Sequence, residues 1–415
     1  MKVEQTCAAA QQASRTLAGL SRARKDETLA AVAEALERRA GEILVENEED
    51  VRLARENRLP DAMVDRLLLD DDRLADAVAS VRAVAALPDP VGQVVDGWRL
   101  ENGVDLRKVR VPLGVVAVIY EARPNVTVEA ASLCIKTGNA VILRGGSAAK
   151  HSNRILAEVV QGAVIESGLP REAVSYLGPD RTELQDLLKQ RRYVDLVVPR
   201  GSEDLKDFLL EHSKVPVIYA AGGNCHVYVD AAADLDKAVP IIVNAKCQRP
   251  GVCNAAETLL VHRDVAGAFL PRAVDELKRR GVELVVDKAS ADLLADPSLK
   301  RANKTHFETE FLSLKLAVRV VESLDEALQH IATYGTRHSE AIVTEDVTAA
   351  RRFCAGVDAA CVYVNASTRF TDGGQFGLGA EMGISTQKLH ARGPIALQEL
   401  TTVKYELWGD GQVRG

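Results

Sequence analysis

The residues best suited to chemistry lie in one segment of the 415-residue chain, Asn244-Ala-Lys-Cys247-Gln-Arg-Pro-Gly251-Val-Cys253-Asn254, between a predicted helix and a predicted strand. The Pro-Gly step exposes the backbone just before Cys253. A cysteine on such a turn can present its sulfur to a cleft while its own N–H faces a bound oxygen. A single cysteine is more often a small buried hydrophobe, and Cys247, at the end of the helix, is the competing nucleophile. The turn favours Cys253.

Two other polar segments are candidates for binding a substrate. Glu121-Ala-Arg123-Pro124-Asn125 directly follows a predicted strand, and ligands bind at strand ends in parallel sheets. The amide of Asn125 could donate to a developing oxyanion, or the residue could simply cap a helix. Asn365-Ala-Ser-Thr-Arg369-Phe-Thr-Asp-Gly-Gly lies near the end of the last predicted strand. Arg369 could grip a carboxylate or a phosphate there, or the loop could be a solvated turn.

A third segment, Arg144-Gly145-Gly146-Ser147, follows a predicted strand and precedes Lys150 and a helix. The two glycines allow close approach of the backbone, and two cations suit the 2′-phosphate of an adenosine cofactor. A tight strand-to-helix turn explains the same pattern equally well. The sequence has neither a G-x-G-x-x-G fingerprint in the right context nor a Walker A loop.

The elements that must position these residues begin with about ninety helical residues, with a cap predicted at Asp26. In residues 94–111 the pattern changes to alternating apolar and polar residues, and the Asn102-Gly103 step predicts a β-hairpin. A hairpin with few large apolar residues buries itself poorly, so this one suits an arm that pairs with another subunit. Alternating strands and helices follow and predict two α/β domains with parallel sheets. The predicted strands are Val115–Tyr120, Ala140–Arg144, Val174–Leu177, Leu196–Val198, Val215–Tyr219, Thr258–His262, Val282–Val286, Ala341–Thr344 and Cys361–Val364.

Composition narrows the function classes. The formal net charge is -7 and the isoelectric point about 5.7, which disfavours nucleic acid or an anionic membrane surface as partner. No apolar run is long enough to span a bilayer, and the N-terminus does not resemble a signal peptide, so a cytoplasmic enzyme is expected. The seven cysteines form no C-x-x-C pair, which argues against a disulfide framework and against a zinc site. No bound metal is expected.

Together and in this order, these segments resemble the aldehyde dehydrogenase superfamily and, within it, the γ-glutamyl phosphate reductases of proline biosynthesis. The strings that carry the likeness are E-A-R-P-N-V-T, I-L-R-G-G-S, Q-R-P-G-V-C-N-A-A-E-T-L-L, Y-V-N-A-S-T-R-F-T-D-G-G-Q-F-G-L-G-A-E and S-T-Q-K-L-H-A-R-G-P. The resemblance implies an aldehyde-dehydrogenase-like α/β fold of two doubly wound domains with a β-hairpin oligomerisation arm. Residues 1–92 and 112–223 would form the NADP-binding domain, 224–395 the catalytic domain, and 93–111 with 396–415 the arm of a homo-oligomer.

The resemblance also implies roles for single residues. Cys253 matches the catalytic cysteine, and Asn125 matches the side-chain donor of the oxyanion hole. NADPH is the implied cofactor, and Glu310 is a candidate ligand of its nicotinamide ribose, although the superfamily's Glu-x-Phe is displaced here by one residue. The residues expected at the rest of the cofactor are Arg144, Gly145, Gly146, Ser147 and Lys150 at the adenosine 2′-phosphate, and Gly201 and Ser202 at the pyrophosphate. The expected substrate ligands are Arg123, Arg369 and Arg392.

One departure from the superfamily bears on the reaction. Hydrolytic aldehyde dehydrogenases carry a Glu-Leu-Gly-Gly segment whose Glu activates water, whereas the equivalent stretch here is Ala220-Ala-Gly-Gly223. Without that base a Cys253 thioester would persist, which suits the NADPH-dependent reduction of L-glutamyl 5-phosphate to L-glutamate 5-semialdehyde and phosphate. A hydrolytic semialdehyde dehydrogenase is the alternative enzyme, and a non-catalytic scaffold is an alternative of another class. The acyl phosphate is expected from a separate glutamate kinase, with channelling as one route.

Overall fold

The computed structural model describes residues 3–219 and 222–414, and the chain divides into two compact units. The first unit is made of Met1–Tyr219, Gly377–Gly383 and Ile395–Gly415, and the second of Ala220–Phe376 and Ile384–Pro394. Residues 377–383, which the sequence places in the catalytic domain, therefore belong to the first unit. The functional roles expected of the two domains stay predictions.

The first unit begins with the helices that the 3.6-residue spacing predicts. They are α1 (Val3–Ala18), α2 (Arg22–Arg38), α3 (Ala40–Glu56), α4 (Asp61–Leu67) and α5 (Asp71–Ala86). The predicted cap at Asp26 is wrong, because Asp26 lies inside α2 and Ser21 caps that helix by accepting from the backbone N–H of Arg24 at 3.3 Å. Asp26 instead accepts a hydrogen bond from the buried Lys136. Within the described residues, no helix has both the length and the apolar character needed to cross a membrane.

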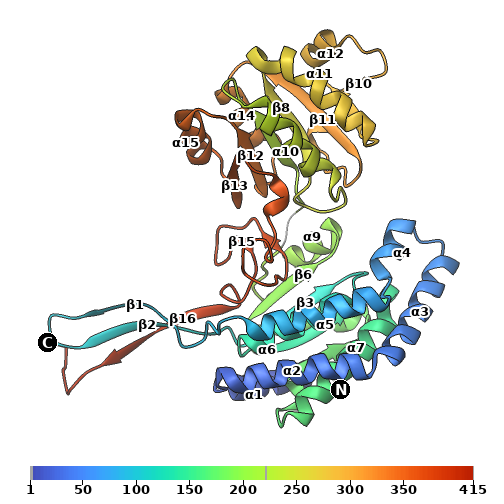
Figure 1. Ribbon diagram of the computed structural model, residues 1–415. Helices are drawn as coiled ribbons and strands as arrows, with labels where there is room; N and C mark the ends of the chain where they lie inside the picture. The colour runs from blue at the N-terminus through green and yellow to red at the C-terminus, as the bar shows by residue number, and fades with distance from the viewer. Residues whose placement is uncertain (1–2, 220–221, 415) are drawn as a thin grey trace. The chain divides into compact units, whose positions relative to one another are not determined.

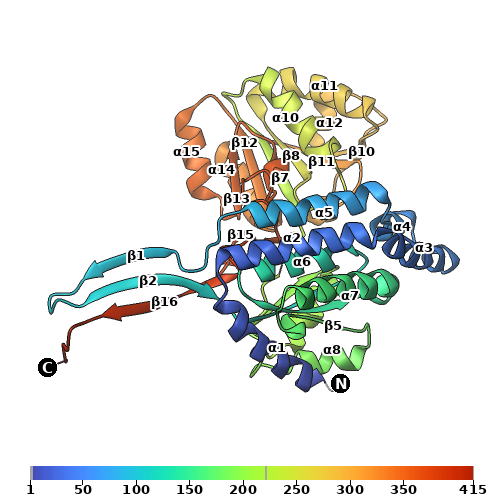
Figure 2. The ribbon, with the colours of Figure 1, turned by 60° about the horizontal axis from the view of Figure 1, so that its bottom comes forward.

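A four-stranded parallel sheet forms the core of the first unit, in the order β5-β4-β3-β6 (Figure 1). Its strands are β3 (Val115–Tyr120), β4 (Ala140–Gly145), β5 (Val174–Leu177) and β6 (Leu196–Arg200), and the helices that follow them are α6 (Asn125–Lys136), α7 (Lys150–Glu166), α8 (Arg181–Leu187) and α9 (Glu203–His212). Right-handed crossovers place α6 and α7 on one face and α8 on the other, where α8 contacts α1 (Figure 2). The predicted strand Val215–Tyr219 is reduced to a single bridge between Val217 and Val197, because Pro216 has no N–H to extend the ladder.

The predicted hairpin is confirmed and gains a third strand. β1 (Val94–Arg99) and β2 (Asp105–Pro112) pair in antiparallel fashion, and Gly103 in the turn has a φ of 89°. β16 (Thr401–Trp408) pairs with the other edge of β2, so the arm is a three-stranded sheet in the order β1-β2-β16 (Figure 1). Its side chains are mostly exposed.

A seven-stranded parallel sheet forms the core of the second unit, in the order β10-β9-β11-β8-β7-β12-β13. Its strands are β7 (Cys225–Val229), β8 (Ala256–His262), β9 (Glu283–Val286), β10 (Lys300–Arg301), β11 (Lys315–Val321), β12 (Ser339–Val343) and β13 (Cys361–Val364). The helices are α10 (Leu235–Cys247), α11 (Arg263–Arg279), α12 (Lys288–Leu294), α13 (Lys304–Glu308), α14 (Leu324–Tyr334) and α15 (Val347–Gly356). Separate apolar clusters cover the two faces of the sheet, one around α10 and α11 and the other around α14 and α15. The predicted doubly wound arrangement is confirmed.

Candidate active site

The turn that joins α10 to β8 carries Cys253 and reaches the amino ends of the neighbouring strands. β7 begins at Cys225, whose thiol donates to the carbonyl oxygen of Cys253 across 3.2 Å. Cys253 is partly exposed, whereas Cys225 is fully buried. The buried thiol therefore anchors the backbone of the turn and leaves the side chain of Cys253 accessible.

The competing cysteines are poorer nucleophiles. Cys247 is the last residue of α10 and is also partly exposed, but burial raises the pKa of its thiol above the ordinary value. Complete burial raises the pKa of the Cys225 thiol much further. Because the thiolate is the reactive form, a raised pKa works against both residues. Neither of them stands on an open turn as Cys253 does.

The backbone at Gly223 passes directly behind Cys253. A β-carbon at position 223 would lie 1.4 Å from the carbonyl oxygen of Cys253, so this approach requires glycine. The N–H of Gly223 donates to Oε1 of Glu310 at 2.6 Å, which brings the predicted ribose ligand to the same turn. Ala220, the position of the missing hydrolytic base, lies outside the described residues.

A buried ion pair closes the base of the Cys253 turn. Nζ of Lys246, in the last turn of α10, lies 2.6 Å from Oε2 of Glu257 in β8, and neither side chain is exposed. The other oxygen of Glu257 accepts from the N–H of Leu312 at 3.2 Å, which ties the segment around Glu310 to the same strand. Burial raises the pKa of Glu257 to about 7 and lowers that of Lys246. This pair was not predicted from the sequence, where its only indication is that a lysine precedes the Cys253 turn and a glutamate follows it.

The loop that follows β13 is fastened to the residue after Cys253. The hydroxyl of Thr368 donates to the carbonyl of Asn254 at 2.7 Å, and the Asn254 amide donates to the carbonyl of Thr371 at 2.8 Å. The guanidinium of Arg369 donates to Gln248 Oε1 at 2.8 Å through Nε and to Asn254 Oδ1 through Nη1. The structure thus brings Arg369, a predicted substrate ligand, to the cysteine turn.

Arg249 is a second cation on this turn and was not predicted. It lies between Gln248 and Pro250, is exposed, and acts electrostatically on Arg369. Burial and the positive charge of Arg249 together lower the pKa of Arg369. The signal for Arg249 was available in the sequence, because it stands in the same Gln-Arg-Pro-Gly string that precedes Cys253.

The other two predicted substrate arginines are placed differently. Nη1 of Arg392 lies 2.8 Å from Oδ1 of Asp358, a carboxylate that also binds Lys388 at 2.8 Å. The hydrogen bonds from Lys388 and Arg392 lower the pKa of Asp358 to about 2. Arg392 therefore already has a carboxylate partner within the protein. Arg123 belongs to the first unit and is half-buried after β3.

Asn125 is the first residue of α6 in the first unit. It does not cap the helix: Pro124 occupies the cap position, and Nδ2 of Asn125 donates to Oε1 of Glu129 at 2.7 Å. An amide nitrogen carries two hydrogens, so the bond to Glu129 orients the group and leaves the second hydrogen for a ligand.

The two glycines at the end of β4 allow other segments of the first unit to pack closely against the backbone. A β-carbon at Gly145 would lie 2.0 Å from Nδ2 of Asn153, and one at Gly146 would lie 3.3 Å from the Cα of Glu121. Ser147 and Lys150 follow at exposed positions, Ser147 in a short 3-10 turn and Lys150 at the start of α7. An exposed lysine at a helix N-terminus fits an anionic phosphate.

Two other predicted cofactor residues already have partners. Arg144 is 8% exposed, its Nη2 donates to the carbonyl of Pro179 at 2.6 Å, and burial lowers its pKa. Ser202 caps α9, and its N–H and hydroxyl bind the two carboxylate oxygens of Glu121 at 2.8 and 3.2 Å. The exposed Gly201 and Ser202 stand at the carboxyl end of β6, beside the sheet's topological switch point, where dinucleotides bind in open α/β sheets. Of the residues predicted to bind the cofactor at this edge, Ser147 and Lys150 are exposed, as are Gly201 and Ser202.

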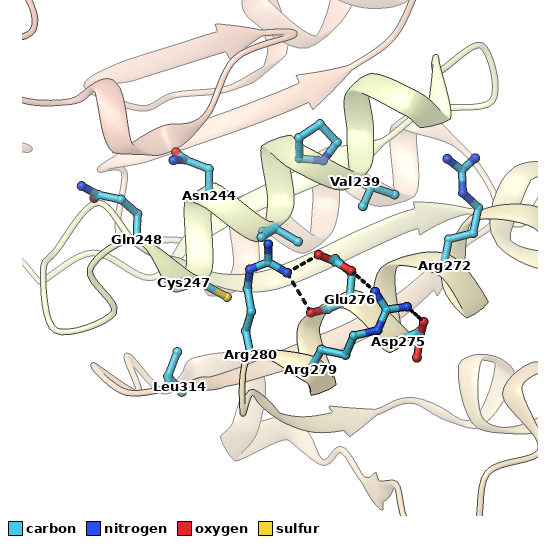
Figure 3. Close-up of a pocket in the computed structure, with 12 residues that line it drawn as sticks. Val239, Asn244, Cys247, Gln248, Arg272, Asp275, Glu276, Arg279, Arg280 and Leu314 are labelled. Atoms are coloured by element: carbon cyan, nitrogen blue, oxygen red, sulfur yellow. Dashed lines mark hydrogen bonds and ion pairs between the residues drawn. The ribbon is translucent and has the colours of Figure 1, made fainter.

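A pocket in the second unit reaches Gln248 at the start of the cysteine turn but is not lined by Cys253. It has a volume of about 820 Å³ and opens on the surface of α10 and α11, where it includes Cys247 (Figure 3). Its arginines are neutralised: Arg279 pairs with Asp275 and Glu276, and Arg280 with Glu276. The pocket therefore offers little net positive charge to an acyl phosphate.

Comparison with known proteins identifies the family. The aldehyde dehydrogenase family model matches residues 1–293. A gamma-glutamyl phosphate reductase from Thermobifida fusca is 53% identical over 98% of this chain and 97% of its own. The crystal structure of a gamma-glutamyl phosphate reductase from Thermotoga maritima matches with a TM-score of 0.97 at 44% identity, over 100% of both chains. An acetylating aldehyde dehydrogenase from Geobacillus thermoglucosidasius, 18% identical, shares the fold with a TM-score of 0.71 over 100% of this chain and 97% of its own. The chain belongs to the aldehyde dehydrogenase family and, within it, to the γ-glutamyl phosphate reductases.

Proposed function

We propose that this chain reduces L-glutamyl 5-phosphate to L-glutamate 5-semialdehyde and phosphate, the second step of proline biosynthesis. The observation that carries the proposal is the Cys253 turn, where an accessible thiol stands beside the cations Arg249 and Arg369. A thiol supplies the nucleophile for acyl transfer, and the cations suit a substrate that carries a phosphoryl group. The names of the relatives support the same reaction.

The proposed reaction begins when the thiolate of Cys253 attacks the acyl carbon. A carbon–sulfur bond forms, the carbon–oxygen bond to the phosphoryl group breaks, and phosphate leaves with the electron pair. The thioester then accepts a hydride, which the nicotinamide cofactor supplies when bound, and collapse of the tetrahedral species releases the aldehyde and regenerates the thiolate. The backbone anchors at Gly223 and Cys225 hold the sulfur in place through these steps.

The oxyanion of the tetrahedral species needs hydrogen-bond donors. We propose the N–H of Cys253 and the amide of Asn125, as the sequence indicates. Each such donor commonly contributes about 10²–10³-fold to turnover. The bond from Asn125 to Glu129 supports this role because it fixes the rotamer of the amide.

We propose NADPH as the preferred cofactor. Lys150 carries most of this proposal, since it is exposed at the N-terminus of α7. Ser147 and the Gly145–Gly146 turn would meet the same phosphate, Gly201 and Ser202 the pyrophosphate, and Glu310 the nicotinamide ribose. Arg144 would act mainly by supporting the turn, since its guanidinium is bonded to the carbonyl of Pro179.

We further propose that the arm mediates homo-oligomerisation in the cytoplasm, and that a separate glutamate kinase supplies the acyl phosphate. The arm exposes large apolar side chains along β16, with Leu407 58% and Trp408 64% exposed. Sedimentation of the Leu407→Lys/Trp408→Lys double variant tests the arm: the oligomer should dissociate, and an unchanged mass would contradict the proposal.

The decisive experiment follows NADP⁺ reduction by glutamate semialdehyde in buffer with and without phosphate. Phosphate-dependent turnover supports the acyl phosphate reaction, because phosphate must accept the acyl group from Cys253. Rapid turnover without phosphate would instead establish the hydrolytic dehydrogenase. No turnover under either condition, by a folded protein, would favour the scaffold.

A further inference from the structure

Two cations near the Cys253 turn, Arg249 and Arg369, have no ion-pair partner among the described residues. Arg249 makes no ion pair and no hydrogen bond with the described residues, and Arg369 makes no ion pair with them. The arginines of the nearby pocket behave differently, since Arg272 and Arg280 each pair with an acid. Arg249 and Arg369 repel each other, and Asp372, which attracts Arg369 without forming an ion pair, offsets only part of that repulsion. An anion between the two cations is therefore favourable.

Arg369 is held in position to receive such an anion. Its Nε and Nη1 donate to Gln248 and Asn254, both on the cysteine turn. A guanidinium has five N–H donors, so three remain for a ligand while the group itself is fixed. Arg249 follows Gln248 directly, which places its charge on the same turn.

Building on the proposed function, we infer that Arg249 and Arg369 form the subsite for the phosphoryl group that departs from the substrate. The substrate has two anionic ends, and their distances from the attacked carbon differ. The phosphorus is two bonds from that carbon, whereas the α-carboxylate carbon is four bonds away, about 5 Å in an extended chain at bond lengths of about 1.5 Å. A cation on the turn that carries the nucleophile, and another hydrogen-bonded to that turn, are therefore better placed for the phosphoryl end than for the α-carboxylate.

The subsite also stabilises the leaving group. Charge builds up on the phosphoryl oxygens as the carbon–oxygen bond breaks, and preorganised cations there favour departure. In the reverse direction the same cations bind free phosphate, so the inference predicts a change in the Michaelis constant for phosphate.

The kinetic test compares Arg249→Gln and Arg369→Gln in the oxidative direction. The KM for phosphate should rise about tenfold or more, while the KM for glutamate semialdehyde stays within about twofold. A rise in the KM for semialdehyde alone would assign the pair to the α-carboxylate and overturn the inference. If both Michaelis constants were unchanged, the inference would also be overturned. If the unaltered enzyme oxidises glutamate semialdehyde equally fast without phosphate, that result would contradict the proposed function rather than this inference. Arg280→Gln, which removes a cation paired with Glu276, is the matched control and should leave both constants unchanged.

A second test needs neither substrate nor cofactor. The alkylation rate of Cys253 is measured with anionic iodoacetate and neutral iodoacetamide, with peptide mass spectrometry to separate it from Cys247 and Cys354. Arg249→Gln should lower the iodoacetate-to-iodoacetamide ratio about threefold or more, because it removes a nearby positive charge. Arg249 is exposed and makes no hydrogen bond or ion pair with the described residues, so its replacement is expected to leave the fold intact. An unchanged ratio in Arg249→Gln would show that this cation is remote from the sulfur, and the inference would fail.

Discussion

Alanine in place of Gly223 is expected to displace Cys253. The added β-carbon would lie 1.4 Å from the carbonyl oxygen of Cys253, 2.5 Å from its carbonyl carbon and 3.1 Å from its Cα. Real β-carbons keep at least 3.0 Å from other atoms, so the two backbones must separate by no less than 1.6 Å, the difference between these two values. All three of these atoms belong to the main chain, and no flexible side chain can move aside to absorb the change.

A shift of this size should cost most of the activity. Displacement of a reacting group by about 1 Å can lower turnover about 10²-fold, so Gly223→Ala should lose at least about 100-fold in kcat. The hydrogen bond from Gly223 to Glu310 and the bond from Cys225 to Cys253 are short, at 2.6 and 3.2 Å. Separation of the two backbones must break at least one of these hydrogen bonds. Because that changes the position of Cys253, the rate at which its thiol is alkylated should change as well.

Gly251→Ala is the matched control, because Gly251 lies two residues before the same cysteine. A β-carbon there would find its nearest neighbour, the Leu312 carbonyl oxygen, at 3.8 Å, which is ordinary contact. The assay is phosphate-dependent NADPH formation from glutamate semialdehyde, with thermal unfolding to confirm that both variants fold. If Gly223→Ala keeps a kcat close to that of Gly251→Ala, the reasoning that Gly223 fixes the nucleophile is refuted.

Four other outcomes are expected. Cys253→Ala should abolish turnover while Cys247→Ala keeps most of it, and equal loss in two folded variants would remove the assignment. Lys150→Ala should lower kcat/KM for NADPH about tenfold or more and leave kcat/KM for NADH nearly constant, because one charge-assisted contact is worth about 1.5–3 kcal/mol. Equal losses with both cofactors would show that Lys150 does not bind the 2′-phosphate. Burial raises the pKa of Glu257 from 4.5 to about 7, so the stability that its protonated form contributes is complete below pH 4.5 and is lost as the pH rises through 7. In urea titrations, the unfolding free energy of the unaltered protein relative to that of Glu257→Gln should fall by about 2 kcal/mol between about pH 5.5 and about pH 8. The same pH dependence in both proteins would contradict this shift. Ala220→Glu should give NADPH formation in phosphate-free buffer, and its absence there would show that a carboxylate at this position cannot reach the attacking water.

The fold could be predicted where a strand contains an uninterrupted apolar run, as in β3 and in residues 259–261 of β8. β7 and β11 were missed although both are central in their sheet. β7 contains His226, which is fully buried because Glu340 accepts from its backbone N–H and binds its ring nitrogen at 2.9 Å. β11 contains Arg319, which Glu326 binds at 2.6 Å. The partner of His226 is 114 residues away in the sequence, whereas the partner of Arg319 lies only seven residues away, in the next helix. In both strands the polar residue interrupts the apolar pattern, and the pattern of the strand itself does not show the partner that allows its burial.

The candidate site could be predicted only in part for the same reason. The exposed turn at Cys253 has a local signal, and Arg369 stands in a dense polar loop. The crowding at Gly223 arises because the segment before β7 lies against the Cys253 turn, 30 residues further along the chain. The pair of Lys246 and Glu257 joins the end of α10 to β8 across that turn. A further obstacle is the location of Cys253 at the amino edge of its sheet, since the usual rule directs attention to the carboxyl edge.

The division of the chain has a consequence for its synthesis. The polypeptide passes between the two units after Tyr219, Phe376, Gly383 and Pro394, so the first unit is assembled from three separate segments. The buried amide of Asn139 donates to the carbonyl of Leu400, and β16 is the last strand to leave the ribosome. A nascent chain that ends at residue 219 therefore holds the whole β3–β6 sheet but lacks the partner of Asn139 and one edge of the arm. The first unit therefore completes its fold only after the second unit and β16 have been synthesised, and until then its amino-terminal part lacks these contacts.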